Sequence, residues 1–187
     1  MSNKKIFDLI TLHKWNEVTK IILENKNIDL NIRDNSSYYL INYAIMFNNY
    51  NLVKLLIEKG CKLDMLDTDN RNILYLPIKF SYNNILELLL DKINNIGIPL
   101  DEMYDNNGFY PIHHAVLFNN FEAIKLLKKY KRNLNLEDRD GNLPIFKAIS
   151  SNNFQIFEFL LNEMSDINYQ NKNGETILHL SSNYGYD

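Results

Sequence analysis

Two adjacent histidines, His113 and His114, are the residues of this chain whose types most directly suggest chemistry. They are half of the four histidines present, and they lie in the stretch HHAVLFNNF. A metal site or an acid–base pair needs side chains that converge, and on a helix such neighbours stand three or four residues apart. No other His, Cys or acidic cluster stands at a zinc-ligand spacing. We therefore predict a structural role for the pair and no metal site.

Other signatures of catalysis or cofactor binding are missing from the sequence. It contains no GxxxxGK[ST] phosphate-binding loop and no GxGxxG, GxSxG or HExxH motif. Scattered aspartates stand where turns are expected, and their short side chains stabilise turns. These residues are Asp34, Asp67, Asp69, Asp105, Asp138 and Asp140. We predict no catalytic residue, no cofactor and no enzymatic activity.

The bulk composition argues against several classes of partner. The 187 residues include 45% hydrophobic and 23% charged side chains, and the net charge of −3 leaves no basic excess to attract a phosphate backbone. The densest basic stretch, KLLKKYKR at 125–132, has interleaved apolar residues and is typical of the solvated face of a helix. No apolar stretch approaches the length of a membrane span. We expect neither a nucleic-acid nor a membrane partner.

Cysteine usage and the N-terminal sequence bear on the compartment. Cys61 is the only cysteine, so the sequence allows no internal disulfide, and we interpret the residue as a small buried apolar side chain. The N-terminal stretch MSNKKIFDLI lacks the long apolar segment of a secretion signal. These observations favour a soluble protein of the cytoplasm.

The elements that position these residues repeat along the chain. The stretch LVKLLIE at 52–58 returns as ILELLLD at 85–91, as AIKLLK at 123–128 and as IFEFLLN at 156–162. Equivalent positions follow one another at steps of 34, 33, 38, 33 and 33 residues, at Lys5, Tyr39, Asn72, Tyr110, Leu143 and Thr176. Such a period predicts an array of similar units, none of which can bury its apolar face alone.

Segments of the form D-x-x-G-x-x-P-I-x-x-A separate the apolar stretches, most clearly at 105–115 and 138–148. Apolar residues at helical spacing predict two short amphipathic helices in each unit. Pro111 and Pro144 stand at the expected first helical position, where a missing N–H costs nothing and φ is already set. Gly108 stands in the preceding turn, where a positive φ is wanted, as do Gly141 and Gly174 in their units.

This pattern closely resembles the ankyrin repeat, whose D-x-x-G-x-T-P-L-H-x-A-A motif and 33-residue period recur here over essentially the whole chain. GETILHLSSNYG near the end is the best match to the motif. The resemblance implies an all-α ankyrin-repeat solenoid of about six helix-turn-helix repeats joined by β-hairpin-like loops. We expect one array over 1–187, whose last repeat is incomplete. The approximate repeats are 1–33, 34–66, 67–104, 105–137, 138–170 and 171–187.

Ankyrin repeats usually place glycine at the end of the first helix of each unit. Asparagine is the next best residue for the left-handed conformation that such an end requires. The residues at this position are Asn48, Ser81, Asn119, Asn152 and Gly185. The recurrent Asn-Asn pairs at 48–49, 119–120 and 152–153 therefore have a local structural reason.

The third repeat departs from the pattern in two ways. Pro77 falls about one turn into its first helix, so we expect that helix to be kinked or to start late. A five-residue excess around 92–99 then separates it from the fourth repeat. We interpret this excess as a surface loop after a slightly extended second helix.

The resemblance also implies roles for single residues. In the family, the histidine of T-P-L-H makes buried hydrogen bonds between repeats, and His113 and His179 match it. The asparagine at the end of a repeat can be hydroxylated by an asparaginyl hydroxylase in ankyrin proteins. Asn31, Asn135 and Asn168 match that residue, although a turn hydrogen bond is the role we favour for them.

The family typically engages partners through hairpin tips and the concave side of the first helices. Phe47, Phe80 and Phe118 occupy the same register in three consecutive repeats, so stacking of the repeats would place them as a ladder along the groove. An exposed apolar strip usually marks an interaction site, and aromatic residues with arginine dominate binding hot spots. Further candidate residues for partner binding are Met46, Leu117, Tyr38, Arg71, Phe109 and Tyr184. The alternative is that the rings pack flat against the next helix and belong to the core.

The sequence therefore predicts a non-enzymatic protein–protein interaction module. Similar Asn-rich ankyrin proteins occur in large DNA viruses, AT-rich protists and intracellular bacteria, which suggests a host-interaction role in the host cytoplasm. The alternative is the substrate-recognition part of a larger ubiquitin-ligase adaptor or multidomain protein. We expect a monomer, or association through the uncapped C-terminal end, where no second helix covers the last repeat; a homotypic scaffold is a further possibility.

Overall fold

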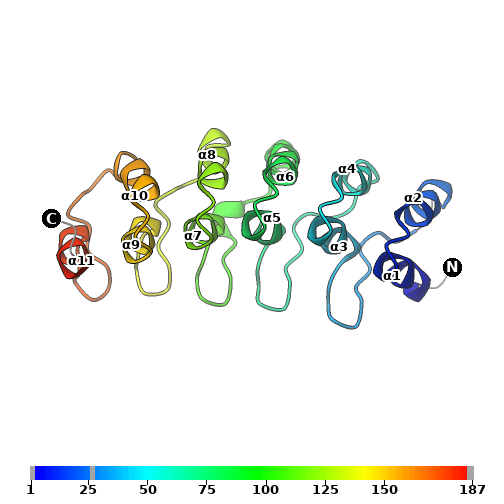
Figure 1. Cartoon of the computed structure of the whole chain (residues 1–187), viewed down its shortest axis with the longest axis horizontal. Coiled ribbons are helices and arrows are strands. Elements are labelled where there is room, and N and C mark those ends of the chain that lie inside the picture. Colours follow the sequence, from blue (N-terminus) through cyan, green and yellow to red (C-terminus); the bar gives the residue numbers. More distant parts are fainter. Residues whose placement is uncertain (1–2, 26–27, 185–187) are drawn as a thin grey trace.

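The computed structural model describes residues 3–25 and 28–184, with side chains for 5–25 and 28–182. Figure 1 shows two parallel rows of short helices, from which loops project on one side. The inner row consists of α1 (Asn3–Thr11), α3 (Leu40–Met46), α5 (Tyr75–Lys79), α7 (Pro111–Leu117), α9 (Pro144–Ser150) and α11 (Ile177–Tyr184). The outer row consists of α2 (Trp15–Glu24), α4 (Tyr50–Glu58), α6 (Asn83–Ile96), α8 (Phe121–Lys129) and α10 (Phe154–Leu161). The predicted all-α solenoid is confirmed.

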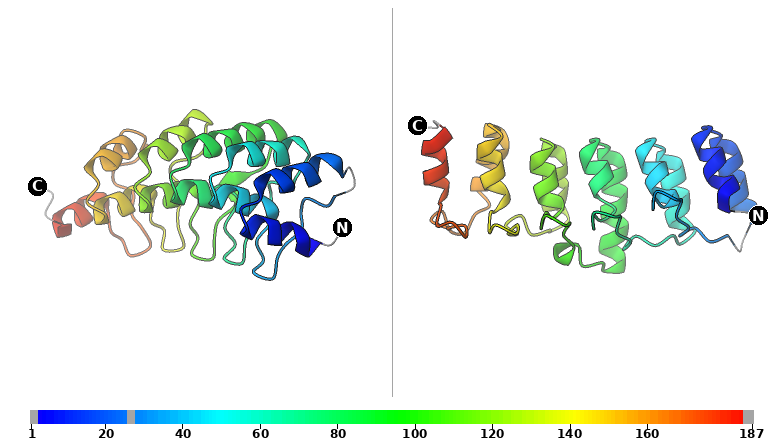
Figure 2. Two further views of the ribbon diagram at one scale, coloured as in Figure 1. Left: turned by 45° about the vertical axis from the view of Figure 1, so that its right-hand side comes forward. Right: turned by 90° about the horizontal axis from the view of Figure 1, so that it is seen from below.

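From α3 to α11 each inner helix packs against the next inner helix, and in the outer row α6 packs against both α4 and α8. The two ends of the chain therefore lie at opposite ends of an elongated array (Figure 2). Inner helices carry buried alanines at equivalent places (Ala44, Ala115 and Ala148), and these small side chains let neighbouring helices approach closely. Every unit buries its apolar face only by stacking on the next one.

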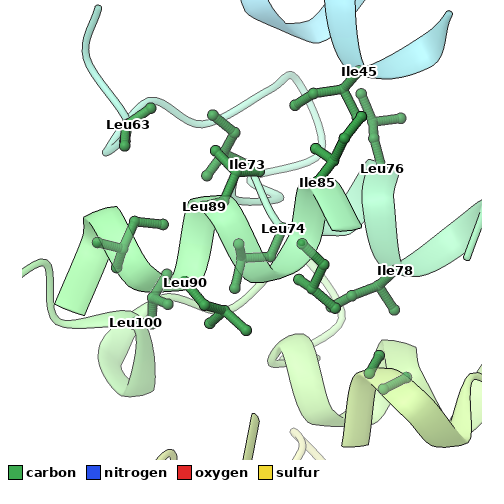
Figure 3. Packing of buried hydrophobic residues seen from close by; sticks show 14 of the residues in the cluster. Ile45, Leu63, Ile73, Leu74, Leu76, Ile78, Ile85, Leu89, Leu90 and Leu100 are labelled. Atoms are coloured by element: carbon green, nitrogen blue, oxygen red, sulfur yellow. The ribbon is translucent and has the colours of Figure 1, made fainter. Parts of the chain in front are cut away.

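Apolar side chains fill the space between the two rows and form one continuous core. Figure 3 shows this core in the third repeat, where Leu74 and Ile78 meet Ile85 and Leu89 of α6. All four side chains are fully enclosed. Burial of one such side chain contributes about 1.5 to 3 kcal/mol before the entropic cost of ordering the chain is subtracted.

The turn between the two helices of a repeat uses both members of the Asn-Asn pair. The first asparagine is left-handed as predicted, with φ of 52° at Asn48, 54° at Asn119 and 53° at Asn152. The second asparagine caps the outer helix: Asn49, Asn120 and Asn153 accept hydrogen bonds from the backbone N–H three residues later. Ser81 adopts the same conformation with φ of 56°, and Gly185 lies outside the described residues.

The third repeat deviates as the proline predicts, because α5 has five residues and begins only at Tyr75, so the late start is confirmed. The predicted extension of the second helix is confirmed, but the interpretation of the five-residue excess as mainly a surface loop is wrong. The excess is helical: α6 runs for 14 residues, whereas α4 and α8 have nine. Leucine-rich helical periodicity continues to the buried Ile93, and Gly97 with φ of 75° ends the helix. A short 3-10 turn, η1 (Leu100–Glu102), leads to the next loop.

The hairpin-like loops are closed by their aspartates, as predicted. Asp105 Oδ1, for example, accepts hydrogen bonds from the N–H groups of Asn107 at 2.8 Å and Phe109 at 2.9 Å. Asp138 Oδ1 accepts equivalent bonds from Asp140 and Asn142. The glycines of these turns have positive φ, 79° at Gly108, 75° at Gly141 and 77° at Gly174. Pro111 and Pro144 begin α7 and α9 at the predicted position.

Candidate protein-binding surface

His113 is held inside the stack by hydrogen bonds that join two repeats. Its Nδ1 accepts from the backbone N–H of Tyr110 at 3.2 Å, and Nε2 lies 3.3 Å from the carbonyl oxygen of Asn142 in the next repeat. Burial lowers its pKa to about 4, so the ring is neutral near pH 7. The predicted architectural role is confirmed for this residue. His179 is exposed, and its Nδ1 lies 2.8 Å from the hydroxyl of Thr176.

His114, the next residue of α7, makes contacts of its own with aromatic rings and with an aspartate. Its ring lies between Phe109 and Phe118, with centroids 5.8 Å and 6.2 Å away, and meets the edge of Tyr75 at 4.9 Å. Nε2 is 3.3 Å from Asp105 Oδ2 at an angle that makes no hydrogen bond. Burial lowers the pKa of His114 to about 4, although the negative charge of Asp105 acts in the opposite direction.

We call Tyr75, Phe109, His114 and Phe118 the central cluster, which spans the third and fourth repeats. Tyr75 and Phe118 are in contact across the two repeats, with ring centroids 5.8 Å apart. Cations border the cluster on both sides. The Arg71 guanidinium lies 4.1 Å from the Tyr75 ring centroid, and the Lys147 ammonium lies 5.1 Å from that of Phe109.

Both bordering cations are held by aspartates of the loops. Arg71 Nε is 2.7 Å from Asp67 Oδ2, and Arg71 Nη2 lies 2.9 Å from Asp69 Oδ2. Lys147 Nζ is 3.3 Å from Asp138 Oδ2. These pairs fix long side chains above aromatic rings, so the surface around the central cluster is ordered before any partner arrives.

The three candidate phenylalanines each stand directly after an inner helix, as the C-cap residues of α3, α5 and α7. Phe47 is 41% exposed and Phe80 is 43% exposed, whereas Phe118 is half-buried. Phe47 packs on His13 and Trp15 at 4.7 Å and 5.2 Å, and Phe80 stacks on Tyr82 at 5.6 Å. Two of the rings therefore present exposed area, and the third is partly built into the stack.

The other candidate residues fall into two places on the array. Arg71 and Phe109 join Phe118 through the central cluster. Tyr38 precedes α3, so about 10 Å of helix separates it from Phe47 at the other end. Leu117 is 49% exposed, Met46 is half-buried, and the Tyr184 side chain lies outside the described part of the chain.

Sequence reasoning missed Tyr75 and His114 as members of this surface. A signal for one of them exists, because a loop aspartate is followed nine residues later by a polar side chain that it contacts. The pairs are Asp34 with the Tyr43 hydroxyl, Asp105 with His114 and Asp138 with Lys147. No pattern of this kind points to Tyr75, whose place depends on the late start of α5.

The candidate hydroxylation residues each donate a turn hydrogen bond from the backbone N–H to a side chain two residues earlier, and two of them also bond between repeats through their side chains. Asn31 Oδ1 accepts from the backbone N–H of Lys62 at 2.9 Å, and Asn135 Nδ2 donates to the carbonyl of Glu163 at 2.9 Å. Asn168 is exposed. Hydroxylation of these residues stays a prediction.

Other features of the sequence find structural roles in the array. The basic stretch at 125–132 contacts both neighbours, because Lys129 Nζ lies 2.6 Å from Glu87 and Lys128 Nζ lies 2.5 Å from Glu163. Cys61 is buried, which raises the pKa of its thiol to about 12. Among residues 3–25 and 28–184, no three His, Cys, Asp or Glu side chains are grouped to hold a metal ion. In the same residues, no helix is long and apolar enough to cross a membrane.

Comparison with known proteins identifies the architecture. A family model described as ankyrin repeats in three copies matches residues 10–101 and again 97–171. The chain belongs to the ankyrin-repeat family. Ankyrin arrays are general protein–protein interaction modules, and family members generally do not act as enzymes.

Relatives of this ankyrin array occur in large DNA viruses. An ankyrin repeat protein of Acanthamoeba polyphaga mimivirus is 37% identical over 134 residues, which cover 70% of this chain and 18% of that protein. An ankyrin repeat protein of fowlpox virus is 33% identical over 122 residues, or 62% of this chain and 34% of that protein. The chain thus spans about a fifth to a third of these relatives. The crystal structure of EF0377, an ankyrin repeat protein, superimposes with a TM-score of 0.86 at 14% identity, over all of this chain and 94% of that one.

Proposed function

We propose that this ankyrin array binds a partner protein through the central cluster and the exposed phenylalanines at the ends of the inner helices. The observation that supports it most directly is the exposure of Phe47, Phe80 and Leu117, each at least two fifths accessible, in a stack that buries most apolar side chains of its inner helices. Phe47 and Phe80 stand at one register and Leu117 at the register just before it, and exposed apolar side chains that recur in this way favour an interaction site over chance exposure.

The proposed binding energy comes from a surface that is ordered in advance. Arg71 and Lys147 are held over aromatic rings by aspartates, so their immobilisation costs little at the moment of binding. The aromatic residues and arginine gathered around His114 are the types that dominate hot spots. We expect Phe118 and Tyr75 to form the centre of the contact and Phe47 to lie at its edge.

A host-interaction role in the cytoplasm of a host cell is the biological setting we propose, supported by the viral relatives. The alternative is that the array is the recognition part of a larger adaptor, such as that of a ubiquitin ligase. The short share of the relatives that the chain spans is compatible with it. Affinity capture from host lysate with mass spectrometry separates the two, because an adaptor enriches ligase subunits together with a substrate.

The test of the binding surface is a variant in which Phe47, Phe80 and Phe118 are all alanine. We expect capture of the partner to fall at least tenfold, because a hot-spot side chain contributes about 2 kcal/mol or more. The matched control replaces Leu23, Ile96 and Phe154, which are also exposed but lie on outer helices, and should leave capture unchanged. A large fall in melting temperature with unchanged capture by the phenylalanine variant would contradict the proposal.

A further inference from the structure

A second concave feature lies between the loops of the fourth and fifth repeats. It is a cleft of about 290 Å³. Its lining residues are Tyr104, Gly108, Tyr110, Glu137, Asp138 and Arg139. None of these side chains except Asp138 has a role in the binding surface described above, where Asp138 holds Lys147.

Two tyrosine rings form one wall of the cleft. The centroids of Tyr104 and Tyr110 are 5.4 Å apart, with the ring planes tilted by 60°. Both residues are held through their backbones: Asn70 Nδ2 donates to the Tyr104 carbonyl at 2.7 Å, and the Tyr110 N–H donates to His113 Nδ1. The backbones of the pair are therefore held in place, and Tyr104 is exposed to solvent.

Two carboxylates, those of Asp101 and Glu137, act on this wall, and the Arg139 cation stands at the rim of the cleft. The pKa of Tyr110 is raised by burial first, and then by Tyr104, Asp101 and Glu137. Glu137 is exposed and lines the same cleft, and its carboxylate also accepts a hydrogen bond from the Tyr169 hydroxyl. The aliphatic part of Arg139 and its backbone lie against Gly108, where an added Cβ would stand 2.7 Å from Arg139 Cγ. A tyrosine pair that faces a carboxylate attracts a cation through the ring quadrupoles and the formal charge together.

The second repeat shows what a cation does at the same register. Tyr39 is the equivalent of Tyr110, and both tyrosines precede an inner helix in extended conformation. Six residues before Tyr39 stands Arg33, at the place that Tyr104 takes in the fourth repeat. The Arg33 guanidinium lies over the Tyr39 ring, 4.3 Å from its centroid, and one of its nitrogens donates to the Tyr39 hydroxyl. In the fourth repeat a second ring replaces this internal arginine.

We propose that the cleft formed by Tyr104, Tyr110 and Glu137 binds an arginine side chain of a partner protein. The planar guanidinium would lie against the tyrosine rings, as that of Arg33 does on Tyr39, and would pair with the Glu137 carboxylate. Arginine fits better than lysine because its flat, weakly hydrated head stacks on rings and binds a carboxylate with two N–H groups. This site is separate from the phenylalanine surface, so the two can fail independently.

The experiment titrates the full chain, with ¹³C-labelled tyrosine rings, with N-acetyl-argininamide and with its uncharged analogue N-acetyl-citrullinamide. We expect saturable shifts of the Tyr104 and Tyr110 ring signals with argininamide, at a millimolar dissociation constant. Citrullinamide should bind at least about fivefold more weakly, because it lacks the charge. Equal shifts with both compounds, or no shift with either, would overturn the proposal.

Three variants test which residues form the site. Glu137→Gln should weaken argininamide binding about three- to fivefold, whereas the control Glu158→Gln, at an exposed position on α10, should not change it. Tyr104→Arg introduces the residue found in the second repeat, and should fold normally while it abolishes binding by filling the cleft. Arg139→Ala should preserve or strengthen binding, since it removes a cation from the rim. Unchanged binding in both Glu137→Gln and Tyr104→Arg would sink the assignment.

Discussion

His113 and His114 illustrate how little a residue's type says about its task. Both are buried in α7, and burial lowers both pKa values to about 4. The first ring joins two repeats through hydrogen bonds, and the second fills an aromatic cluster with no hydrogen-bond partner in the described structure. What first suggests chemistry is therefore a pair of neutral packing residues with different neighbours.

Their buried, neutral state predicts a loss of stability in mild acid. The folded-state pKa lies below the value of 6.5 expected in the unfolded chain, so the unfolded state takes up protons first as the pH falls. The contribution is complete above pH 6.5 and is lost as the pH falls from 6.5 towards 4. We expect a slope of up to about 1.4 kcal/mol per pH unit for each histidine, measured by urea unfolding at intervals over that range.

The contribution of each ring can be separated by substitution. His114→Phe keeps an aromatic side chain among Phe109, Phe118 and Tyr75 and should reduce the slope by about half. His13→Gln, which removes an exposed imidazole, is the control. A slope that is the same in His114→Phe and in the natural sequence would show that His114 does not carry this dependence.

At the scale of the element, an asparagine in the turn between the two helices of a repeat has two structural roles. Asn120 caps α8 by accepting from the Ala123 N–H at 3.0 Å, and its Nδ2 also donates to the Ile78 carbonyl at 3.0 Å and to Asn83 Oδ1 at 3.1 Å. The same side chain thus starts one helix and ties its repeat to the one before.

We expect Asn120→Ala to destabilise the array by about 2 to 3 kcal/mol, because it removes a cap and leaves buried partners without their donor. Asn49→Ala removes only the cap hydrogen bond that the Leu52 N–H donates, and should lower the free energy of unfolding by about 1 kcal/mol. Asn120→Asp retains the acceptor but not the donor, so it should be worse than Asn49→Ala. Equal melting temperatures for Asn49→Ala and Asn120→Ala would refute the inter-repeat role.

The elements also show where sequence reasoning reaches its limit. Local rules predicted the prolines that start α7 and α9, the left-handed asparagines and the late start of α5, because each follows from backbone sterics. The extension of α6 was predicted but its length was underestimated, since an insertion gives no sign of how far it prolongs a helix until Ile93 is seen to be buried. The second asparagine of each pair was overlooked because its role depends on a helix start that lies outside the pair.

At the scale of the whole molecule, the last repeat of the stack differs from the repeats before it. Ile41, Ile112 and Ile145 stand at one equivalent position and are at most 2% exposed, whereas Leu178 at that position is 78% exposed. The same sequence pattern therefore produces a core residue where a further repeat packs on it and an exposed apolar residue where none does in the described structure. The repeat pattern predicts which residues are equivalent but not how buried each one is. The same is true of the candidate binding residues.

This difference predicts how the array associates. We expect weak, concentration-dependent association of the chain in sedimentation equilibrium, and we expect Leu178→Glu to abolish it with a change in stability below about 0.5 kcal/mol. Ile145→Glu, the same change at the buried equivalent, should unfold the array, because it buries an unpaired charge. A Leu178→Glu variant that associates as the natural chain does would exclude the end of the stack as the contact.

The loop glycines have a consequence for the geometry of the whole array. A Cβ at Gly108 would stand 2.7 Å from the backbone nitrogen of Arg139, and one at Gly141 would stand 3.0 Å from that of Lys172. The loops of the fourth, fifth and sixth repeats are thus spaced by bare backbone at these glycines, whereas successive helices are spaced by side chains. The difference between these two spacings sets the curvature of the superhelix. The loop glycines therefore help to determine the radius of the concave face. That radius limits the shape of any molecule that can fit against it.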